Sequence, residues 1–479
     1  MSTETTGLDE RMIDATNNIE VPKSNQQRYS LSNPTLEDIN KLDSVRRLSW
    51  FNRNFRGMKT GSLRGVIIMW IRMTLGIGIL TLPFYIKQYG GLTGIFALLL
   101  AASANYLAYS FIFEASFFTG KKNYPDLIEA LLGKTILRVF RITFILDLTS
   151  TIMIYCIVSW NLCEYIMYFF RIGEEHWDEW IIDKDKLLFD EMHPTIFMIR
   201  GFFFYGIFLL TIPLFLKKSL ESLQKVTICY LISLFTLVGI ILVELPFFKN
   251  AYKHEDTGFR LTKQPQYNWI ECFFGLCISF YVQPFIFSLR GELLLPSLKR
   301  TKKISRISIS IEFLIFLVLG FCGYYALGDT YTPNLMILRK PYPGKSEVSK
   351  MIFRCAITLF FALNVLGLAM YNPSLRDYLS KYVRMSNEKF KYILLSLLPF
   401  FLICTVAFVY PYVIGVTNLF GITVYNFNGY IIPLAMKIVL LRKKGAGAMK
   451  IILTSFVLIG FVTAGIAGLV FRIFDLTVF

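Results

Sequence analysis

Apolar and polar positions follow one another along the chain in long blocks. From residue 64 onward, runs of about 20 mostly apolar residues recur, each long enough to cross the hydrocarbon core of a bilayer as an α-helix. Eleven such segments can be counted, at about 64–88, 92–117, 137–170, 195–216, 226–247, 268–290, 304–327, 350–372, 391–411, 413–441 and 449–473. The pattern predicts an all-α polytopic membrane protein with about eleven transmembrane helices.

Residues 1–60 contain no long apolar run and are rich in Ser, Thr, Asn, Asp and Glu. We expect a disordered cytoplasmic tail without a signal peptide, followed by a transmembrane domain over 61–474. Within the tail, Arg46-Arg47-Leu48-Ser49 fits the pattern of a basophilic-kinase site. A solvated basic flank explains the same residues, so phosphorylation of Ser49 stays open.

Lysine and arginine gather in every second connection between the segments, whereas the connection at 171–193 is rich in Glu and Asp. Because positive residues concentrate in cytoplasmic loops, we expect a cytoplasmic N-terminus and an extracellular or luminal C-terminus. Asn33 and Asn372 are each followed by proline and cannot serve as glycosylation sites. Both the plasma membrane and a vacuolar or lysosomal membrane therefore remain possible locations.

Composition agrees with a membrane protein and excludes several other classes. Hydrophobic residues make up 54% of the chain and aromatic residues 16%, and the mean hydropathy is +0.52. The net charge of +17 comes without a nucleic-acid-binding motif, so we expect no nucleic-acid partner. The eight cysteines lie in or beside apolar segments, as small core residues do. No HExxH, Walker A or GxSxG motif is present, which predicts neither an enzyme nor a metal site.

The first apolar segment, 64–91, is interrupted in its middle. Arg72 lies inside it, and Gly76-Ile77-Gly78 and Pro83 weaken its helical continuity. An unwound stretch at membrane depth survives only where it faces protein, water or a ligand, and free amides at a half-helix N-terminus attract a carboxylate. A continuous, kinked helix whose glycines permit close packing is the alternative.

The sixth segment has a similar interruption, with Gln283 directly before Pro284. Since it comes five segments after the first, the two run in opposite directions. Segments one to five (about 64–247) and six to ten (about 268–441) could therefore form inverted repeats, with 449–473 as an extra helix. The tenth segment carries polar residues between Gly421 and Asn426, which either line a pathway or allow close packing.

Three motifs occur in order along these segments. They are Gly76-Ile77-Gly78-Ile79-Leu80 with Pro83 and Gly90-Gly91, Gln283-Pro284-Phe285 with Glu292-Leu293, and Gly323-Tyr324 with Gly328-Asp329. They resemble motifs of the amino acid/auxin permease family, especially its branch of sodium-coupled neutral and vacuolar or lysosomal amino acid transporters. The resemblance implies an eleven-helix inverted-repeat transporter of the leucine-transporter type that moves amino acids with a coupling cation.

A substrate site follows from the two interrupted helices. Its expected residues are Thr74, Gly76, Ile77, Gly78, Phe280, Tyr281, Gln283 and Tyr425. The amides around Ile77 and Gly78 would bind the α-carboxylate, and helix-six carbonyls near Phe280 the α-ammonium. Tyr281, Gln283 and Tyr425 would border the pocket for the substrate side chain.

Arg72 departs from the family pattern. In the sodium-coupled branch, an Asn at this position contributes to the sodium site, and the partner position on helix eight is Asn364 here. A guanidinium repels Na⁺, so we favour H⁺ coupling or exchange, with Na⁺ not excluded. We expect no cofactor. If Arg72 is buried it requires an acidic partner, for which Asp147 is preferred and Glu114 second; snorkelling to the interface is the alternative. Asp147 is also the first candidate proton carrier.

The sequence therefore predicts a secondary amino acid transporter embedded in a lipid bilayer. The alternative is an amino-acid-sensing receptor on the same scaffold that binds its ligand and transports it poorly.

Overall fold

The structure is a computed structural model that describes residues 63–169, 224–251, 258–293, 296–331, 346–409 and 412–478, except 77, 267, 381 and 384, and single positions between 201 and 216. The expected tail at 1–60, with Ser49, and the acidic connection at 171–193 lie outside the described residues. So does most of the fourth expected segment, 195–216.

The described residues are helical and include no strand. Their α-helices are α4 (Leu63–Thr74), α5 (Gly78–Tyr89), α6 (Gly91–Thr119), α7 (Tyr124–Leu132), α8 (Lys134–Phe169), α11 (Gln224–Ala251), α12 (Trp269–Ser279), α13 (Ile286–Gly291), α14 (Leu298–Tyr331), α15 (Glu347–Leu379), α16 (Glu388–Val409), α17 (Val413–Phe420), α18 (Ile432–Lys443) and α19 (Ala448–Val478). Within the described ranges, nine spans are long and apolar enough to cross a membrane, and the bent pair α4 and α5 makes a tenth. The predicted all-α polytopic class is confirmed.

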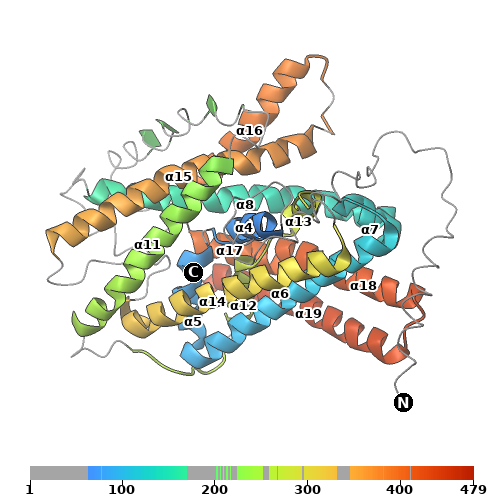
Figure 1. The fold of residues 1–479 in the computed structure, drawn as a ribbon, viewed down its shortest axis with the longest axis horizontal. Coiled ribbons are helices and arrows are strands. Elements are labelled where there is room, and N and C mark those ends of the chain that lie inside the picture. The colour runs from blue at the N-terminus through green and yellow to red at the C-terminus, as the bar shows by residue number, and fades with distance from the viewer. Residues whose placement is uncertain are drawn as a thin grey trace, which may run out of the picture. The chain divides into compact units, whose positions relative to one another are not determined.

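Helices from distant parts of the chain form the core (Figure 1). α14 packs against α4, α5, α6 and α11, while α8 packs against α15 and α16. Large apolar side chains such as Phe96 on α6, Val243 on α11 and Leu402 on α16 remain exposed. Because a bilayer solvates such side chains, these faces suit contact with lipid. α19 is exposed along most of its length, whereas the span formed by α17 and α18 is mostly buried.

The first helix is broken, as its sequence predicts. α4 ends at Thr74, α5 begins at Gly78, and their axes differ by 59°. At the break the Leu75 amide donates to Ile71 O (2.7 Å) and the Gly76 amide turns back to Thr74 O (2.7 Å). Helical hydrogen bonding therefore stops at this point, and the alternative of a continuous kinked helix is wrong.

The sixth helix is broken in the predicted place as well. α12 ends at Ser279, residues 280–282 are not helical, and a single 3₁₀ turn, η4 (Gln283–Phe285), leads into α13. A Cβ built on Gly78 would lie 3.1 Å from Ser279 Cα. The two breaks are therefore adjacent.

Helix ten contains a feature that its sequence did not predict. Between α17 and α18 the chain forms two π-helical turns, η6 (Gly421–Tyr425) and η7 (Phe427–Ile431). Single π turns inside α-helices occur frequently at functional sites, because they displace side chains from the α-helical register.

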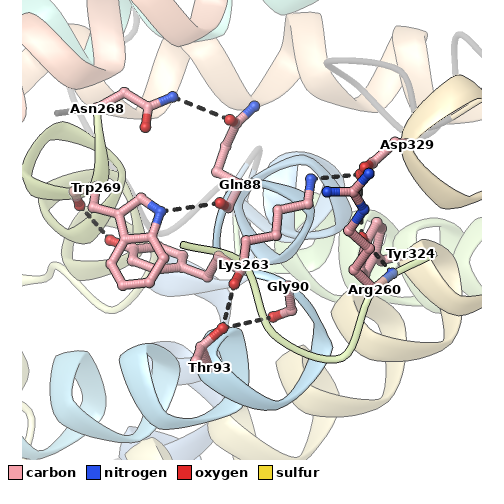
Figure 2. A network of polar contacts seen from close by, with 10 residues as sticks. Gln88, Gly90, Thr93, Arg260, Lys263, Asn268, Trp269, Tyr324 and Asp329 are labelled. Carbon is pink, nitrogen blue, oxygen red and sulfur yellow. Dashed lines mark hydrogen bonds and ion pairs between the residues drawn. The ribbon is translucent and has the colours of Figure 1, made fainter. Parts of the chain in front are cut away.

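The segment 258–266 joins the far end of helix one to the end of helix seven (Figure 2). Its backbone pairs with that of α5 and α6: Gly91 N donates to Arg260 O (3.0 Å) and Lys263 N to Tyr89 O (3.1 Å). The Lys263 ammonium forms an ion pair with Asp329 (2.6 Å), which follows the non-helical Gly328 near the end of α14. We call this set of contacts the clasp.

The clasp explains why the family-like motifs carry glycine, tyrosine and aspartate. Gly90 has φ +89° and ψ +161°, which non-glycine residues rarely adopt, and a Cβ there would lie 3.0 Å from the backbone of Thr262 and Lys263. Tyr324 Oη accepts the Arg260 amide and donates to Asp329 (both 3.1 Å). These motif residues hold a junction between helices.

The glycine requirement at position 90 can be tested against a matched glycine. Gly133 has nearly the same backbone conformation, φ +86° and ψ +177°, but nothing lies within 4 Å of its would-be Cβ. We expect Gly133→Ala to cost about 1–3 kcal/mol from backbone strain alone. Gly90→Ala should cost about 1–3 kcal/mol more, because the methyl group also meets the clasp backbone. Apparent melting temperatures in detergent measure both, and equal decreases would contradict the contact at Gly90.

Candidate functional site

The backbone freed at the helix-six break is partnered by α6. Tyr109 Oη donates to Phe280 O (2.5 Å) and accepts from Val282 N (2.9 Å). Asn105 Nδ2 donates to Cys277 O (3.1 Å) one turn earlier. Sequence reasoning missed both side chains, although they stand out as polar residues in the apolar segment 92–117. The Phe280 carbonyl, expected to bind a substrate ammonium, therefore already has a donor.

A buried carboxylate lies beside the same break. Asp147 on α8 is 0% exposed, and its Oδ2 accepts from Tyr281 Oη (2.5 Å) and Asn428 Nδ2 (3.2 Å). The rings of Tyr281 and Tyr425 meet edge to face with centroids 4.5 Å apart. Asp147 Oδ1 is buried and has no hydrogen-bond partner among the described residues. Asp147, Tyr281, Tyr425 and Asn428 form what we call the Asp147 cluster.

Gln283 lies next to this cluster and contacts both helix ten and α6. Its Nε2 donates to Gly429 O (3.2 Å), and its Oε1 lies 3.3 Å from Tyr109 Oη, whose hydrogen is closer to Phe280 O. A Cβ on Gly429 would lie 2.9 Å from the ring of Tyr281. The three residues predicted to border the side-chain pocket, Tyr281, Gln283 and Tyr425, therefore gather around the π-helical turns of helix ten.

A second buried carboxylate lies at the helix-one break. Glu312 on α14 is 0% exposed, and its Oε1 accepts from Thr74 Oγ1 at 2.5 Å. Its Oε2 is buried without a hydrogen-bond partner in the described structure. Sequence reasoning placed Thr74 in the substrate site and missed Glu312. The signal was present, because Glu312 is an acidic residue inside the apolar segment 304–327.

Three of the remaining predicted residues, Gly76, Gly78 and Asn364, contact α8 or α12. A Cβ on Gly76 would lie 2.5 Å from Tyr155 Oη, which places that tyrosine against the break. Asn364 Nδ2 donates to Ser159 Oγ (2.7 Å), one turn beyond Tyr155 on α8. Gly78 packs on the end of α12, and Ile77 lies outside the described residues.

Arg72 is buried, at 6% exposed, but the preferred pairing with Asp147 is wrong. The Arg72 guanidinium carbon lies 5.9 Å from the ring centre of Tyr230 on α11. The Asp147 carboxylate instead accepts from Tyr281 and Asn428. The prediction used estimated depth in the membrane, which says nothing about the face of the helix from which a side chain projects.

Glu114, the second candidate partner of Arg72, is also engaged elsewhere. It forms ion pairs with Lys302 on α14 and with Lys437 on α18, the latter at 2.5 Å. The carboxylate therefore joins three helices through two lysines, and the predicted pairing with Arg72 is wrong here too.

The site thus contains one buried carboxylate at each helix break, and within the described structure neither has a cationic partner. An uncompensated charge in this setting costs several kcal/mol. A bound cation, a substrate ammonium or a proton would each remove that cost, so the arrangement suits cation-linked binding.

Comparison with known proteins identifies a family that the sequence matches. Residues 59–476 match the family described as "Transmembrane amino acid transporter protein". The Plasmodium falciparum (isolate 3D7) protein named "Putative amino acid transporter AAT1" is 22% identical over 324 residues, which are 67% of this chain and 49% of that protein. Vacuolar amino acid transporter 2 of Saccharomyces cerevisiae is 20% identical over 409 residues, 81% of this chain and 78% of that protein. The chain spans about half the length of the Plasmodium relatives it matches.

Solved structures of a manganese transporter from Eremococcus coleocola are also similar. The E129A mutant aligns with a TM-score of 0.43 and 10% identity over 88% of this chain and 97% of that chain. Because this TM-score is low, the fold rests on the helices and breaks described above.

Proposed function

Because the chain belongs to the family of transmembrane amino acid transporter proteins, we propose that it is a secondary active transporter that moves an amino acid across a membrane by alternating access. The observation that carries the proposal is the adjacency of two broken helices with the Asp147 cluster beside them. Broken helices supply free backbone groups at membrane depth, which is how many transporters hold a zwitterionic substrate.

The two charged groups of the substrate are assigned to different sides of the breaks. The α-carboxylate binds backbone amides at the start of α5, around Ile77 and Gly78, where the helix dipole favours an anion. The α-ammonium binds Asp147 Oδ1, because that oxygen has no partner among the described residues while the Phe280 carbonyl already accepts from Tyr109. Tyr281 and Tyr425 border the side chain of the substrate.

The orientation and domain plan belong to the same proposal. The tail 1–60 is cytoplasmic, the repeats cover about 64–247 and 268–441, and 449–473 is the extra helix, with the C-terminus extracellular or luminal. The similarity to a yeast protein named as vacuolar supports an endomembrane location.

Coupling to Na⁺ is disfavoured by Arg72. Its guanidinium is buried beside Tyr230, whose ring packs 5.6 Å from that of Phe360 on α15. Phe360 precedes Asn364 by one turn, so Arg72 lies toward the helix that carries the polar partner of the family's sodium site. Two unit charges about 4 Å apart repel by roughly 4 kcal/mol at an effective dielectric of 20, or about three decades of affinity.

We therefore expect uptake to be unchanged when Na⁺ is replaced by choline, and to be stimulated by acid on the outer or luminal side. Uptake of a radiolabelled mixture of the proteinogenic amino acids into proteoliposomes of the purified full chain measures both. A requirement for Na⁺ in the wild-type protein would show that Arg72 does not occupy a former cation site.

The same assay distinguishes a transporter from a receptor. A receptor on this scaffold would bind amino acids, seen as an increase in melting temperature, without catalysing flux into proteoliposomes. Flux above that of protein-free liposomes supports the proposal, and binding without flux overturns it.

A further inference from the structure

We infer that Glu312, hydrogen-bonded to Thr74, is the group that takes up and releases the coupling proton. The inference rests on the proposed transport function and assigns the proton to a site separate from the Asp147 cluster, where the substrate ammonium binds. It is carried by the hydrogen-bond geometry at the helix-one break and by a row of buried polar side chains on α14.

Thr74 is the last residue of α4, so its side chain lies directly at the break. Thr74 Oγ1 is within hydrogen-bond distance of three acceptors: Glu312 Oε1 (2.5 Å), Ile71 O (3.0 Å) and Trp70 O (3.2 Å). A hydroxyl group has one hydrogen and can donate fully to only one of them. The protonation state of Glu312 therefore decides which acceptor receives that hydrogen.

With Glu312 ionised, the hydroxyl donates to the carboxylate, since a charge-assisted hydrogen bond is the stronger one. With Glu312 protonated, the carboxyl O–H donates to Thr74 Oγ1, and the hydroxyl returns its hydrogen to a carbonyl of its own helix. Such back-bonding by threonine alters the bend of a helix end. A proton on Glu312 thus changes the hydrogen bonding of the last turn before the break.

A row of buried polar side chains lies between Glu312 and one end of α14. Thr301, Ser305, Ser308 and Glu312 follow the spacing i, i+4, i+7 and i+11, so they share one helix face, and all four are buried. The row covers about 16 Å at 1.5 Å per residue. Ser308 Oγ is buried and lacks a hydrogen-bond partner in the described part of the chain, as expected for a side chain beside a proton path.

No neighbouring charge neutralises Glu312 in the described structure. α14 packs against α4, α5, α6 and α11. Arg72 of α4 is directed at Tyr230 of α11, and Tyr85 of α5 donates toward α17. Tyr109 of α6 is electrostatically coupled to Glu312 but uses its hydroxyl at the helix-six break. None of these four side chains forms an ion pair or hydrogen bond with Glu312.

The proton balance of one cycle is simple. The Glu312 carboxylate takes one proton from water on the acidic side and becomes a neutral carboxyl group. With Glu312 neutral and the amino acid bound, the protein changes to the orientation that opens to the other side. Glu312 then loses the same proton to water along the α14 row. The row begins at Thr301, directly after Lys299 and Arg300, on the side that the charge pattern assigns to the cytoplasm. One proton accompanies each transported amino acid.

The experiment uses proteoliposomes of the full chain that enclose a pH-sensitive dye. The labelled mixture of proteinogenic amino acids is added at an acidic and at a neutral outer pH. For the wild type we expect several-fold faster uptake at acidic pH, together with acidification of the interior. For Glu312→Gln we expect a ratio of about one between the two pH values and no acidification. Glu347→Gln removes a carboxylate from a surface ion pair and should behave like the wild type.

A conservative pair at Thr74 keeps the inference testable if Glu312→Gln fails to fold. Thr74→Val removes the only described donor to the ionised carboxylate, so half-maximal stimulation should occur at a higher outer pH. Thr74→Ser restores the donor and should restore the wild-type profile. A purely structural role would lower uptake in Thr74→Val without moving the profile, and this result would overturn the inference.

The possible failures are distinguishable. If the wild type shows no amino acid flux, the proposed function itself is wrong. If the wild type transports amino acids without acidifying the interior, or if Glu312→Gln still acidifies it, transport stands and the assignment of the proton to Glu312 is wrong.

Discussion

Gly78→Val should reduce amino acid uptake to the level of protein-free liposomes. A Cβ at this position would lie 3.0 Å from Ser279 Oγ and 3.1 Å from Ser279 Cα, closer than side-chain atoms normally approach a backbone. The two further methyl groups of valine would separate the broken helices and cover the amides proposed to bind the substrate carboxylate. Uptake and detergent-extracted protein are measured on the same membranes, so that lost transport is separated from lost protein.

The matched control is Gly239→Val on α11, where no atom lies within 4 Å of the would-be Cβ. It introduces the same side chain into a membrane helix and should leave uptake unchanged. If Gly78→Val takes up amino acids like the wild type, the substrate carboxylate does not bind at the start of α5 and the two breaks do not approach each other closely.

Asp147→Asn should raise the substrate concentration for half-maximal uptake by roughly 10- to 100-fold. The substitution preserves the shape of the side chain but removes the charge proposed to bind the ammonium group, and a hydrogen bond to a charged group contributes about 1.5–3 kcal/mol. Acid stimulation should persist, because the proton is assigned to Glu312. Concentration series at acidic and neutral pH measure both quantities.

Asp126→Asn on α7 is the control, since Asp126 is an exposed carboxylate outside the spans. It should not alter the affinity. An unchanged half-maximal concentration in Asp147→Asn would remove Asp147 from the substrate site, and a loss of acid stimulation would move the proton to Asp147.

The elements of the fold are readable from the sequence because membrane helices follow from length and hydropathy alone. Both breaks were predicted from residues that weaken helical hydrogen bonding, namely glycine at 76 and 78 and proline at 284. Of the eleven expected segments, only 195–216 falls largely outside the described residues. The remaining ten correspond to described helices or helix pairs.

The details of the site were harder to predict because they depend on helix rotation. Arg72 and Asp147 were paired by depth, but α4 directs Arg72 at Tyr230, while α8 directs Asp147 at Tyr281. The π-helical turns of helix ten shift its side-chain register, so no α-helical projection places Asn428 beside Asp147. Glu312 was visible as an acidic residue in an apolar run, but its partner Thr74 lies 238 positions away along the chain.

α14 is connected to both parts of the broken helix one. Near its far end, the ion pair of Asp329 with Lys263 attaches it to the segment that grips α5. In its middle, Glu312 attaches it to the end of α4. The stretch between Glu312 and Leu327 is helical and about 23 Å long at 1.5 Å per residue, so it acts as a stiff rod. If the protein works by alternating access, as proposed, a movement of α5 is transmitted along this helix to the hydrogen bond between Thr74 and Glu312.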